Sequence, residues 1–187
     1  MSTETLHAEA AALVAALTAR ADTLAVAESL TGGMLAATLT GVPGASAVFR
    51  GGVAAYATDV KTTLLDVPEE AVRSVGVVSA EVAEAMAHGA RHRLGSTYAL
   101  STTGVAGPDP QEGKPVGTVF VAVAGPAERQ HADPAEPGGG PGGGPGVATV
   151  LSLRLAGDRQ RIRVDTCVAA LGLLRRTLDQ AGTLGDA

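Results

Sequence analysis

Apolar and polar positions are distributed along the chain in segments that predict helices and strands in turn. Residues 6–21 are rich in alanine, and Leu13 and Leu17 recur at helical spacing, which predicts a first helix. The short apolar run over 23–27 that follows has the length of a buried strand. Near the C-terminus an apolar stripe predicts a last helix over about 158–181.

Four more strands and four more helical segments are predicted between these ends. The strands are expected at 48–57, 98–102, 116–124 and 148–155, and the helical segments at 30–39, 60–65, 68–72 and 79–94. Ser79 is the expected N-cap of the longest of these helices. The fourth and fifth strands follow one another without an intervening helix, so we expect them to be antiparallel. The order predicts an α/β fold: a three-layer α/β/α sandwich with a mixed, mostly parallel sheet of about five strands.

The length of 187 residues fits a single domain that spans 1–187. Within it, residues 126–146 are dominated by glycine and proline. Such a segment cannot bury a hydrophobic core, so it predicts a flexible insert between two hairpin strands.

Composition excludes several classes of function. Aromatic residues make up 2% of the chain and the net charge is −5, which argues against nucleic-acid binding. No secretory signal and no apolar run of about 18 residues is present, so we expect a cytoplasmic protein without a membrane partner. The single cysteine, Cys167, lies in an apolar helical pattern and is predicted to be a core residue.

The first candidate for chemistry is Ser29, which ends the first strand just before Gly32 and Gly33. Unpaired backbone N–H groups at the start of a helix can hold an anion or a developing oxyanion. The sequence leaves three roles open for Ser29: a helix N-cap, a phosphate ligand or a nucleophile.

A serine nucleophile needs a base, and the histidines are poorly placed for that role. His88 and His92 are four residues apart but lack the glutamate of an H-E-x-x-H motif, so a solvated helix face is favoured and no metal is expected. Lys61, with Tyr56 as a hydrogen-bonding partner, forms a reasonable dyad with Ser29, since burial can lower a lysine pKa. The alternative for Lys61 is a surface lysine on a short helix.

Ligands in α/β folds gather at the carboxyl ends of parallel strands. Three loops should share that edge of the sheet, namely 28–33, 56–61 and 102–109. Together they predict a pocket of hydroxyls and backbone N–H groups, suited to a phosphorylated small molecule or an acyl-transfer oxyanion.

Further polar residues fit this predicted pocket. Thr103 and Gly104 form a second hydroxyl-and-glycine corner, for which a simple turn is the alternative. Arg159, just before the last helix, is a candidate cationic ligand. Arg161 and Arg163 are alternatives to it, and any of the three could equally be a solvated surface residue.

Seven motifs, in order through about residues 5–181, resemble the CinA C-terminal domain family. The first is the A-E-S-x-T-G-G signature at 27–33; the others are 42–46, Tyr56 with Lys61, 76–79, 103–108, 114–117 and 157–159. The family is similar to nicotinamide-nucleotide amidases, which convert nicotinamide mononucleotide to nicotinate mononucleotide and ammonia.

This resemblance implies a stand-alone amidase of α/β/α fold that forms a homodimer and uses no metal and no cofactor. It implies a Ser-Lys mechanism with Ser29, Lys61 and Tyr56 as catalytic residues. The expected substrate-binding residues are Glu28, Thr31, Gly32, Gly33, Thr103, Gly104 and Arg159. Departures from the family pattern occur at Leu30, Thr58 and Asp109, and Thr58 is expected to alter substrate fit.

Two alternatives to this function stay open. One is a non-catalytic nucleotide-binding or competence-associated module that shares the pocket. The other is an amidase for a different carboxamide.

Overall fold

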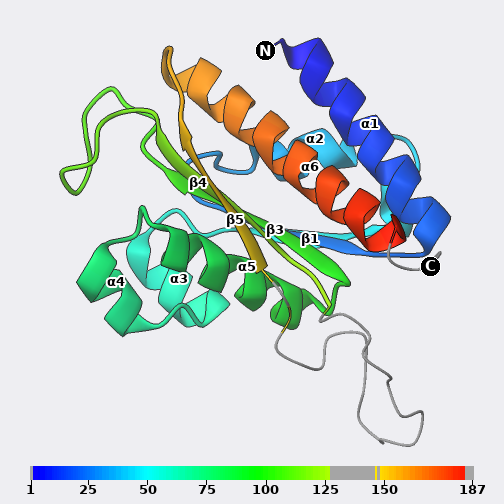
Figure 1. Cartoon of the computed structure of the whole chain (residues 1–187). Coiled ribbons are helices and arrows are strands. Elements are labelled where there is room, and N and C mark those ends of the chain that lie inside the picture. Colours follow the sequence, from blue (N-terminus) through cyan, green and yellow to red (C-terminus); the bar gives the residue numbers. More distant parts are fainter. Residues whose placement is uncertain (1, 127–145, 147, 184–187) are drawn as a thin grey trace, which may run out of the picture.

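The computed structural model of the chain describes residues 2–126, 146 and 148–183. Five strands form one sheet in the order β2-β1-β3-β4-β5, covered by helices on both faces (Figure 1). The predicted α/β sandwich is therefore confirmed. The strands are β1 (Leu24–Glu28), β2 (Phe49–Ala54), β3 (Tyr98–Gly104), β4 (Thr118–Ala124) and β5 (Ala148–Arg154).

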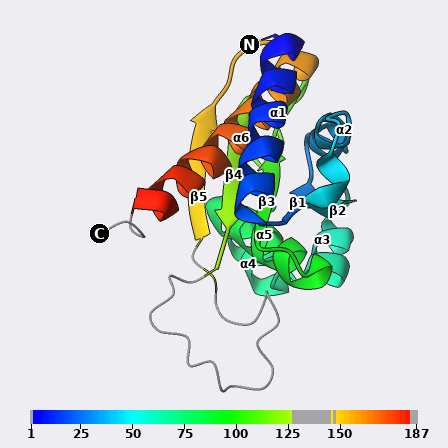
Figure 2. The same cartoon turned by 90° about the vertical axis from the view of Figure 1, so that its right-hand side faces the viewer.

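The helices divide into two layers, one on each face of the sheet (Figures 1 and 2). One layer holds α1 (Thr3–Arg20), α2 (Met34–Thr40) and α6 (Arg159–Thr183). The other holds α3 (Thr58–Leu65), α4 (Glu69–Val75) and α5 (Ala80–Leu94). A short 3-10 helix, η1 (Ala45–Ala47), precedes β2.

The sheet is mixed, as predicted. β1 pairs in parallel with both β2 and β3, whereas β4 is antiparallel to both β3 and β5. Only β4 therefore runs against the other strands, which confirms a mostly parallel sheet. The antiparallel pairing of β4 and β5 was predicted, and that of β3 and β4 was not.

The interior strand β1 is buried on both faces, and its side chains divide between two cores. Leu24 and Val26 pack into the larger cluster, which contains residues of α1, α2 and α6. Ala25 and Ala27 pack into the cluster of the α3–α5 layer, where their small size lets α5 lie close to the sheet. Cys167 belongs to the larger cluster, and burial raises the pKa of its thiol, so its predicted core role is confirmed.

Two predicted helix starts have different outcomes. Ser79 is the N-cap of α5, and its Oγ accepts a hydrogen bond from the Val82 N–H at 3.3 Å, as predicted. The helix expected over 30–39 begins only at Met34. Gly32 and Gly33 have φ values of +57° and +92°, a left-handed conformation that interrupts a right-handed helix.

The predicted Gly/Pro-rich insert at 126–146 lies outside the described residues, apart from Pro126 and Gly146 at its ends. The strands that flank it, β4 and β5, pair as the predicted hairpin. In the part of the chain that the structure describes, no helix is long and apolar enough to cross a membrane.

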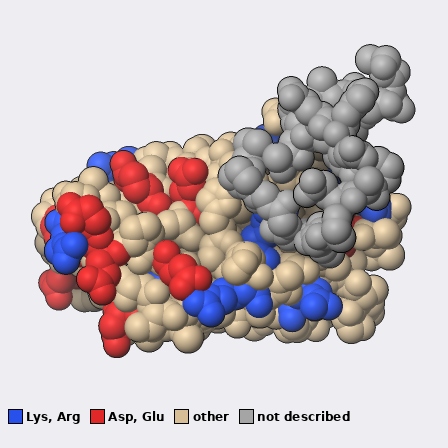
Figure 3. Space-filling model, turned by 90° about the horizontal axis from the view of Figure 1, so that it is seen from below, with Lys and Arg blue, Asp and Glu red and all other residues tan. Residues whose placement is uncertain are grey.

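The α3–α5 side of the molecule carries an uneven distribution of charge. Figure 3 shows acidic side chains gathered toward the end of the molecule where Figure 1 places α4, and basic side chains nearer the middle. Glu69 and Glu70, in the first turn of α4, contribute exposed acidic side chains.

Candidate active site

A pocket of about 180 Å³ opens where β1 and β3 end and where α3 and α6 begin. It brings together six of the predicted site residues from three separate loops and α6: Ser29, Tyr56, Lys61, Thr103, Gly104 and Arg159. The rest of its lining consists of Leu30, Thr58, Val77, Val78, Val105, Ala106, Gly107, Asp109 and Gln111. The three predicted loops therefore do meet at one edge of the sheet.

Ser29 is partly buried, and two backbone hydrogen bonds hold it in position. Its N–H donates to the Thr102 carbonyl at 2.9 Å, and its carbonyl accepts from the Gly32 N–H at 3.1 Å. Its hydroxyl makes no hydrogen bond to any described residue and opens on the pocket. The N-cap of α2 is Gly33, so the alternative in which Ser29 caps this helix is wrong.

The backbone amides at the start of α2 are occupied by Glu28, whose side chain is 1% exposed. Its Oε2 accepts from the N–H groups of Gly33 and Leu35, each at 3.0 Å, and its Oε1 accepts from that of Ala36 at 2.8 Å. These N–H groups already have a charged acceptor, so they are not open to a substrate anion. None of the predicted contacts Glu28, Gly32 and Gly33 lines the pocket; these residues shape the turn instead.

The turn that follows Ser29 is also held by side chains of β3 and α6. The Thr31 hydroxyl lies 2.7 Å from that of Thr102, and the Arg163 guanidinium donates to the Thr31 carbonyl at 2.6 Å. Thr31 is fully buried and supports the turn from below the pocket. The N–H groups of Leu30 and Thr31 have no acceptor among the described residues, and of these two residues only Leu30 lines the pocket.

Lys61 is 1% exposed, so the alternative of a surface lysine is wrong. Its Nζ donates to the carbonyls of Ala55 at 2.7 Å, Tyr56 at 3.3 Å and Ala57 at 3.5 Å. Burial lowers the pKa of the ammonium group, while the nearby carboxylate of Glu112 acts in the opposite direction.

Ser29 and Lys61 line the same pocket, but no hydrogen bond joins Oγ of the first to Nζ of the second. Contacts of this kind often tighten only when a substrate is bound. The Ser-Lys dyad therefore stays a prediction, with both groups in one cavity.

Tyr56 and Arg159 form the rim of the pocket. The Tyr56 ring is 60% exposed, and its hydroxyl accepts a hydrogen bond from Arg159 at 2.7 Å. A second nitrogen of Arg159 donates to the Gly107 carbonyl at 2.7 Å, and this guanidinium has no ion pair with a described carboxylate. Arg161 and Arg163 do not line the pocket, so Arg159 is the candidate among the three arginines.

The second predicted corner, Thr103 and Gly104, forms the floor next to β4. The Thr103 hydroxyl donates to the Val77 carbonyl at 2.7 Å, so only its oxygen lone pairs are available to a ligand. A Cβ atom at Gly104 would lie 2.7 Å from the Thr118 carbonyl oxygen, which explains the glycine.

Sequence reasoning missed three residues of the pocket lining, Val77, Val78 and Gln111, which lie outside the three predicted loops. The two valines lie in the 76–79 motif, but apolar residues in a turn carry no chemical signal. Among the described residues, no group of three or more His, Cys, Asp or Glu side chains is placed to hold a metal ion.

The fold and the pocket together define an α/β protein with a polar cavity for a small ligand at the carboxyl ends of its parallel strands. The chain belongs to the CinA C-terminal domain family, whose model matches residues 6–139.

Relatives of known sequence agree with this assignment. A CinA-like protein of Frankia casuarinae is 51% identical over 162 residues, which cover 87% of this chain and 33% of that protein. A CinA-like protein of Geobacter sulfurreducens is 46% identical over 157 residues, covering 83% of this chain and 33% of that protein. The chain thus spans about a third of the length of these curated relatives.

Solved structures match over nearly their whole length. The competence/damage inducible protein CihA of Agrobacterium tumefaciens has a TM-score of 0.79 and 31% identity, over 94% of this chain and 96% of that one. The competence damage-inducible protein A of Klebsiella pneumoniae has a TM-score of 0.80 and 28% identity, over 93% and 97%.

Proposed function

We propose that this protein is an amidohydrolase that converts nicotinamide mononucleotide to nicotinate mononucleotide and ammonia. The observation that carries the proposal is the pocket shared by Ser29 and Lys61. The serine hydroxyl is free to react, and the buried lysine has a lowered pKa, as a general base requires. The motif resemblance to nicotinamide-nucleotide amidases supplies the substrate.

Lys61 would act as the base in its neutral form. An ammonium group has three N–H donors and a neutral amine has two. Loss of a proton would therefore keep the shorter contacts, to Ala55 and Tyr56, and release the 3.5 Å contact to Ala57. Rotation about the Cε–Nζ bond would then turn the lone pair from the Ala57 carbonyl toward Ser29, where it could accept the serine proton directly or through one water.

In the proposed reaction, Ser29 Oγ attacks the carboxamide carbon and its proton moves to Lys61 Nζ. The C–N bond then breaks, and ammonia leaves with the proton from Lys61. A water molecule attacks the resulting ester and gives a proton to Lys61, which returns it to Ser29 Oγ as the ester bond breaks. The carboxylate product and the resting enzyme result.

The pocket offers groups for both parts of the carboxamide. The N–H group of Leu30, directly after the nucleophile, would stabilise the oxyanion. The Thr103 oxygen, whose own proton is donated to Val77, would accept a hydrogen bond from the carboxamide nitrogen.

The phosphate would bind at the rim, on Arg159. Its guanidinium is exposed, is held in place by Tyr56 and Gly107, and has no described carboxylate as a competing partner. Because Glu28 occupies the amides of α2, the phosphate would be excluded from that helix start. The proposal therefore gives the anion and the oxyanion separate binding places.

The direct test measures ammonia release from nicotinamide mononucleotide by the purified protein and by Ser29→Ala and Lys61→Ala variants. We expect each variant to lose at least about 10²-fold in kcat/KM. Lys114→Met serves as the control, since it removes the other lysine from an exposed position. Wild-type activity in either site variant would disprove the dyad.

A second candidate is a module that binds the nucleotide without turnover. It is favoured by the absence of a hydrogen bond between Ser29 and Lys61 and by the three carbonyl partners of Lys61. Calorimetric binding of the mononucleotide without ammonia release would support it. A screen of carboxamides with and without a ribose phosphate would separate it from an amidase of different specificity.

A further inference from the structure

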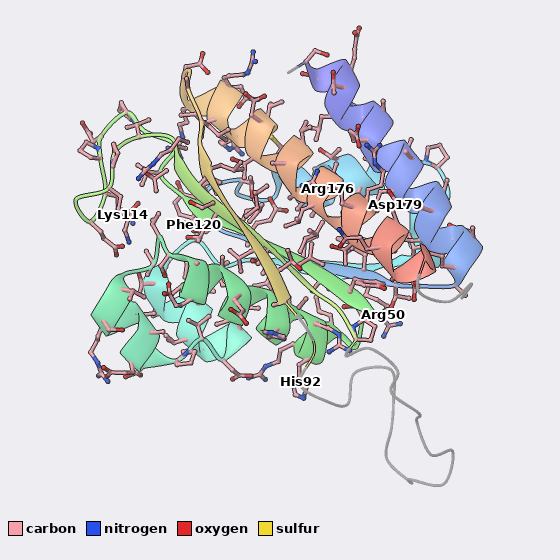
Figure 4. All side chains as sticks on the ribbon, in the orientation of Figure 1. Arg50, His92, Lys114, Phe120, Arg176 and Asp179 are labelled. Atoms are coloured by element: carbon pink, nitrogen blue, oxygen red, sulfur yellow. The ribbon has the colours of Figure 1, made fainter. Side chains whose placement is uncertain are left out.

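The 76–79 turn between α4 and α5 is held against the β3–β4 hairpin by two side chains, and a third holds the end of α4 just before it. Lys114 Nζ donates to the Val75 carbonyl at 2.9 Å, and Figure 4 shows Lys114 on the hairpin, next to α4. The Thr103 hydroxyl donates to the Val77 carbonyl at 2.7 Å. The Glu112 carboxylate accepts from the Val78 N–H at 3.4 Å. Two segments well separated in sequence thus form one wall.

The contact of Glu112 with this turn depends on Gly76. A Cβ atom at Gly76 would lie 2.3 Å from Glu112 Oε2, and Gly76 has a φ of +78°. Any other residue at this position would push the carboxylate away and strain the backbone. The glycine of the 76–79 motif therefore makes room for an acidic side chain.

The wall formed in this way faces the buried lysine. Val77 and Val78 line the pocket together with Lys61. The other titratable or charged side chains that line it are Tyr56, Asp109 and Arg159. Glu112 contacts the Val78 backbone, and its negative charge raises the pKa of Lys61, against the effect of burial.

We propose that Glu112 is a positioning residue of this pocket: its carboxylate holds the 76–79 wall in place and balances the buried charge of Lys61. The structural part of this proposal stands on its own, and its consequence for turnover rests on the proposed amidase. Glu112 touches neither Ser29 nor the substrate in the proposed reaction, so it acts through Lys61.

The expected effect has a definite sign. Burial lowers the pKa of Lys61, and the Glu112 charge raises it. Removal of that charge in Glu112→Gln should therefore lower the pKa of Lys61 further. If neutral Lys61 is the base, activity rises with pH through this pKa, and the rise in the variant should occur at lower pH.

The chain allows this to be measured directly, because Lys61 and Lys114 are its only lysines. Protein labelled with ¹³C at lysine Cε should give two side-chain NMR signals, and Lys114→Met assigns them by removing one. We expect the Lys61 signal to titrate below its ordinary value of 10.5 in the wild type and at still lower pH in Glu112→Gln.

Two variants serve as controls. Lys114→Met breaks a neighbouring contact between the same segments, and it should leave the Lys61 titration unchanged. Glu112→Asp keeps the charge but shortens the side chain, so its titration should lie between those of the wild type and Glu112→Gln. Glu112 is exposed and glutamine keeps an oxygen for the Val78 N–H, so both Glu112 variants should fold.

The titration also separates this proposal from the proposed function. An unchanged Lys61 titration in Glu112→Gln, or the same shift in Lys114→Met, would overturn the role of Glu112 whether or not the protein is an amidase. A shifted titration in a protein that releases no ammonia would support Glu112 and disprove the amidase.

Discussion

Glu28 and Lys61 are buried ionisable side chains that bind the backbone with opposite hydrogen-bonding roles. Each is 1% exposed. The Glu28 carboxylate accepts hydrogen bonds from three backbone N–H groups, and the Lys61 ammonium donates to three backbone carbonyls. In both cases peptide dipoles take the place of the water that the charged group loses on burial.

The difference between the two lies in what each faces. Glu28 is enclosed by the turn and by α2, and it does not line the pocket. Lys61 has one side open to the pocket, and burial lowers its pKa. Hydrogen bonds from a buried side chain to the backbone thus fix the turn at Glu28. At Lys61 the same kind of contact holds a titratable group beside a cavity.

The largest expected effect is a difference in catalytic activity between variants of Lys61 and of Glu28. Lys61→Met keeps much of the side-chain volume but removes the base, so kcat/KM for the mononucleotide should fall by about 10²–10⁴-fold. Steady-state ammonia release measures this loss. Glu28→Gln should lose less, since Glu28 acts only on the position of Ser29. An equal loss in both variants would remove the functional difference between the two sites.

The next effect concerns stability. Glu28→Gln places an amide NH₂ against backbone N–H groups, which leaves buried donors unsatisfied at a cost of about 2 kcal/mol. The thermal midpoint should fall by roughly 4–8 °C. Calorimetry or thermal circular dichroism checks this expectation. A midpoint equal to that of the wild type would show that the carboxylate charge is not needed at the start of α2.

The pH dependence of stability should show that burial of the Lys61 ammonium group destabilises the folded chain. Its folded pKa is below the unfolded value of 10.5, so the unfolded chain binds more protons between these values. The free energy of unfolding of the wild type should therefore rise relative to Lys61→Met as the pH increases toward 10.5. Urea titrations at several pH values measure the difference.

The Lys61→Met comparison cancels the contribution of Cys167, which is present in both proteins. A constant difference in unfolding free energy across this pH range would mean that the pKa of Lys61 is the same in the folded and unfolded chains.

The smallest expected effect comes from an exposed helix cap, which serves as a reference for Glu28. Ser2 caps α1, and its Oγ accepts from the Thr5 N–H at 3.2 Å near the surface. Ser2→Ala should cost about 0.5–1 kcal/mol and leave ammonia release unchanged. A loss as large as that of Glu28→Gln would show that burial does not add to the value of the Glu28 contacts.

Much of the site was predictable because it depends on where strands end and loops begin along the chain. The parallel strands β1 and β3 end at Glu28 and Gly104, so the residues at their carboxyl ends must meet at the same edge of the sheet. The cap at Ser79 and the hairpin of β4 and β5 depend on short segments, and both are confirmed.

The roles of Glu28 and Glu112 were not predictable in the same way. The family resemblance implied that Glu28 contacts the substrate, but its side chain accepts hydrogen bonds from the N–H groups at the start of α2. Glu112 gave no signal at all, since its partner Val78 is more than thirty residues away in sequence.

The sequence by itself determined the α/β fold, the order of its elements along the chain and the three loops that meet at the pocket. Hydrophobic periodicity and turn residues act over short distances, and they fix which segments become strands and which loops share an edge. Only the tertiary structure decided which backbone groups remain free for a ligand. Buried N–H and carbonyl groups find their partners only in the folded chain, and the Ser29 N–H finds its partner on β3, at the Thr102 carbonyl.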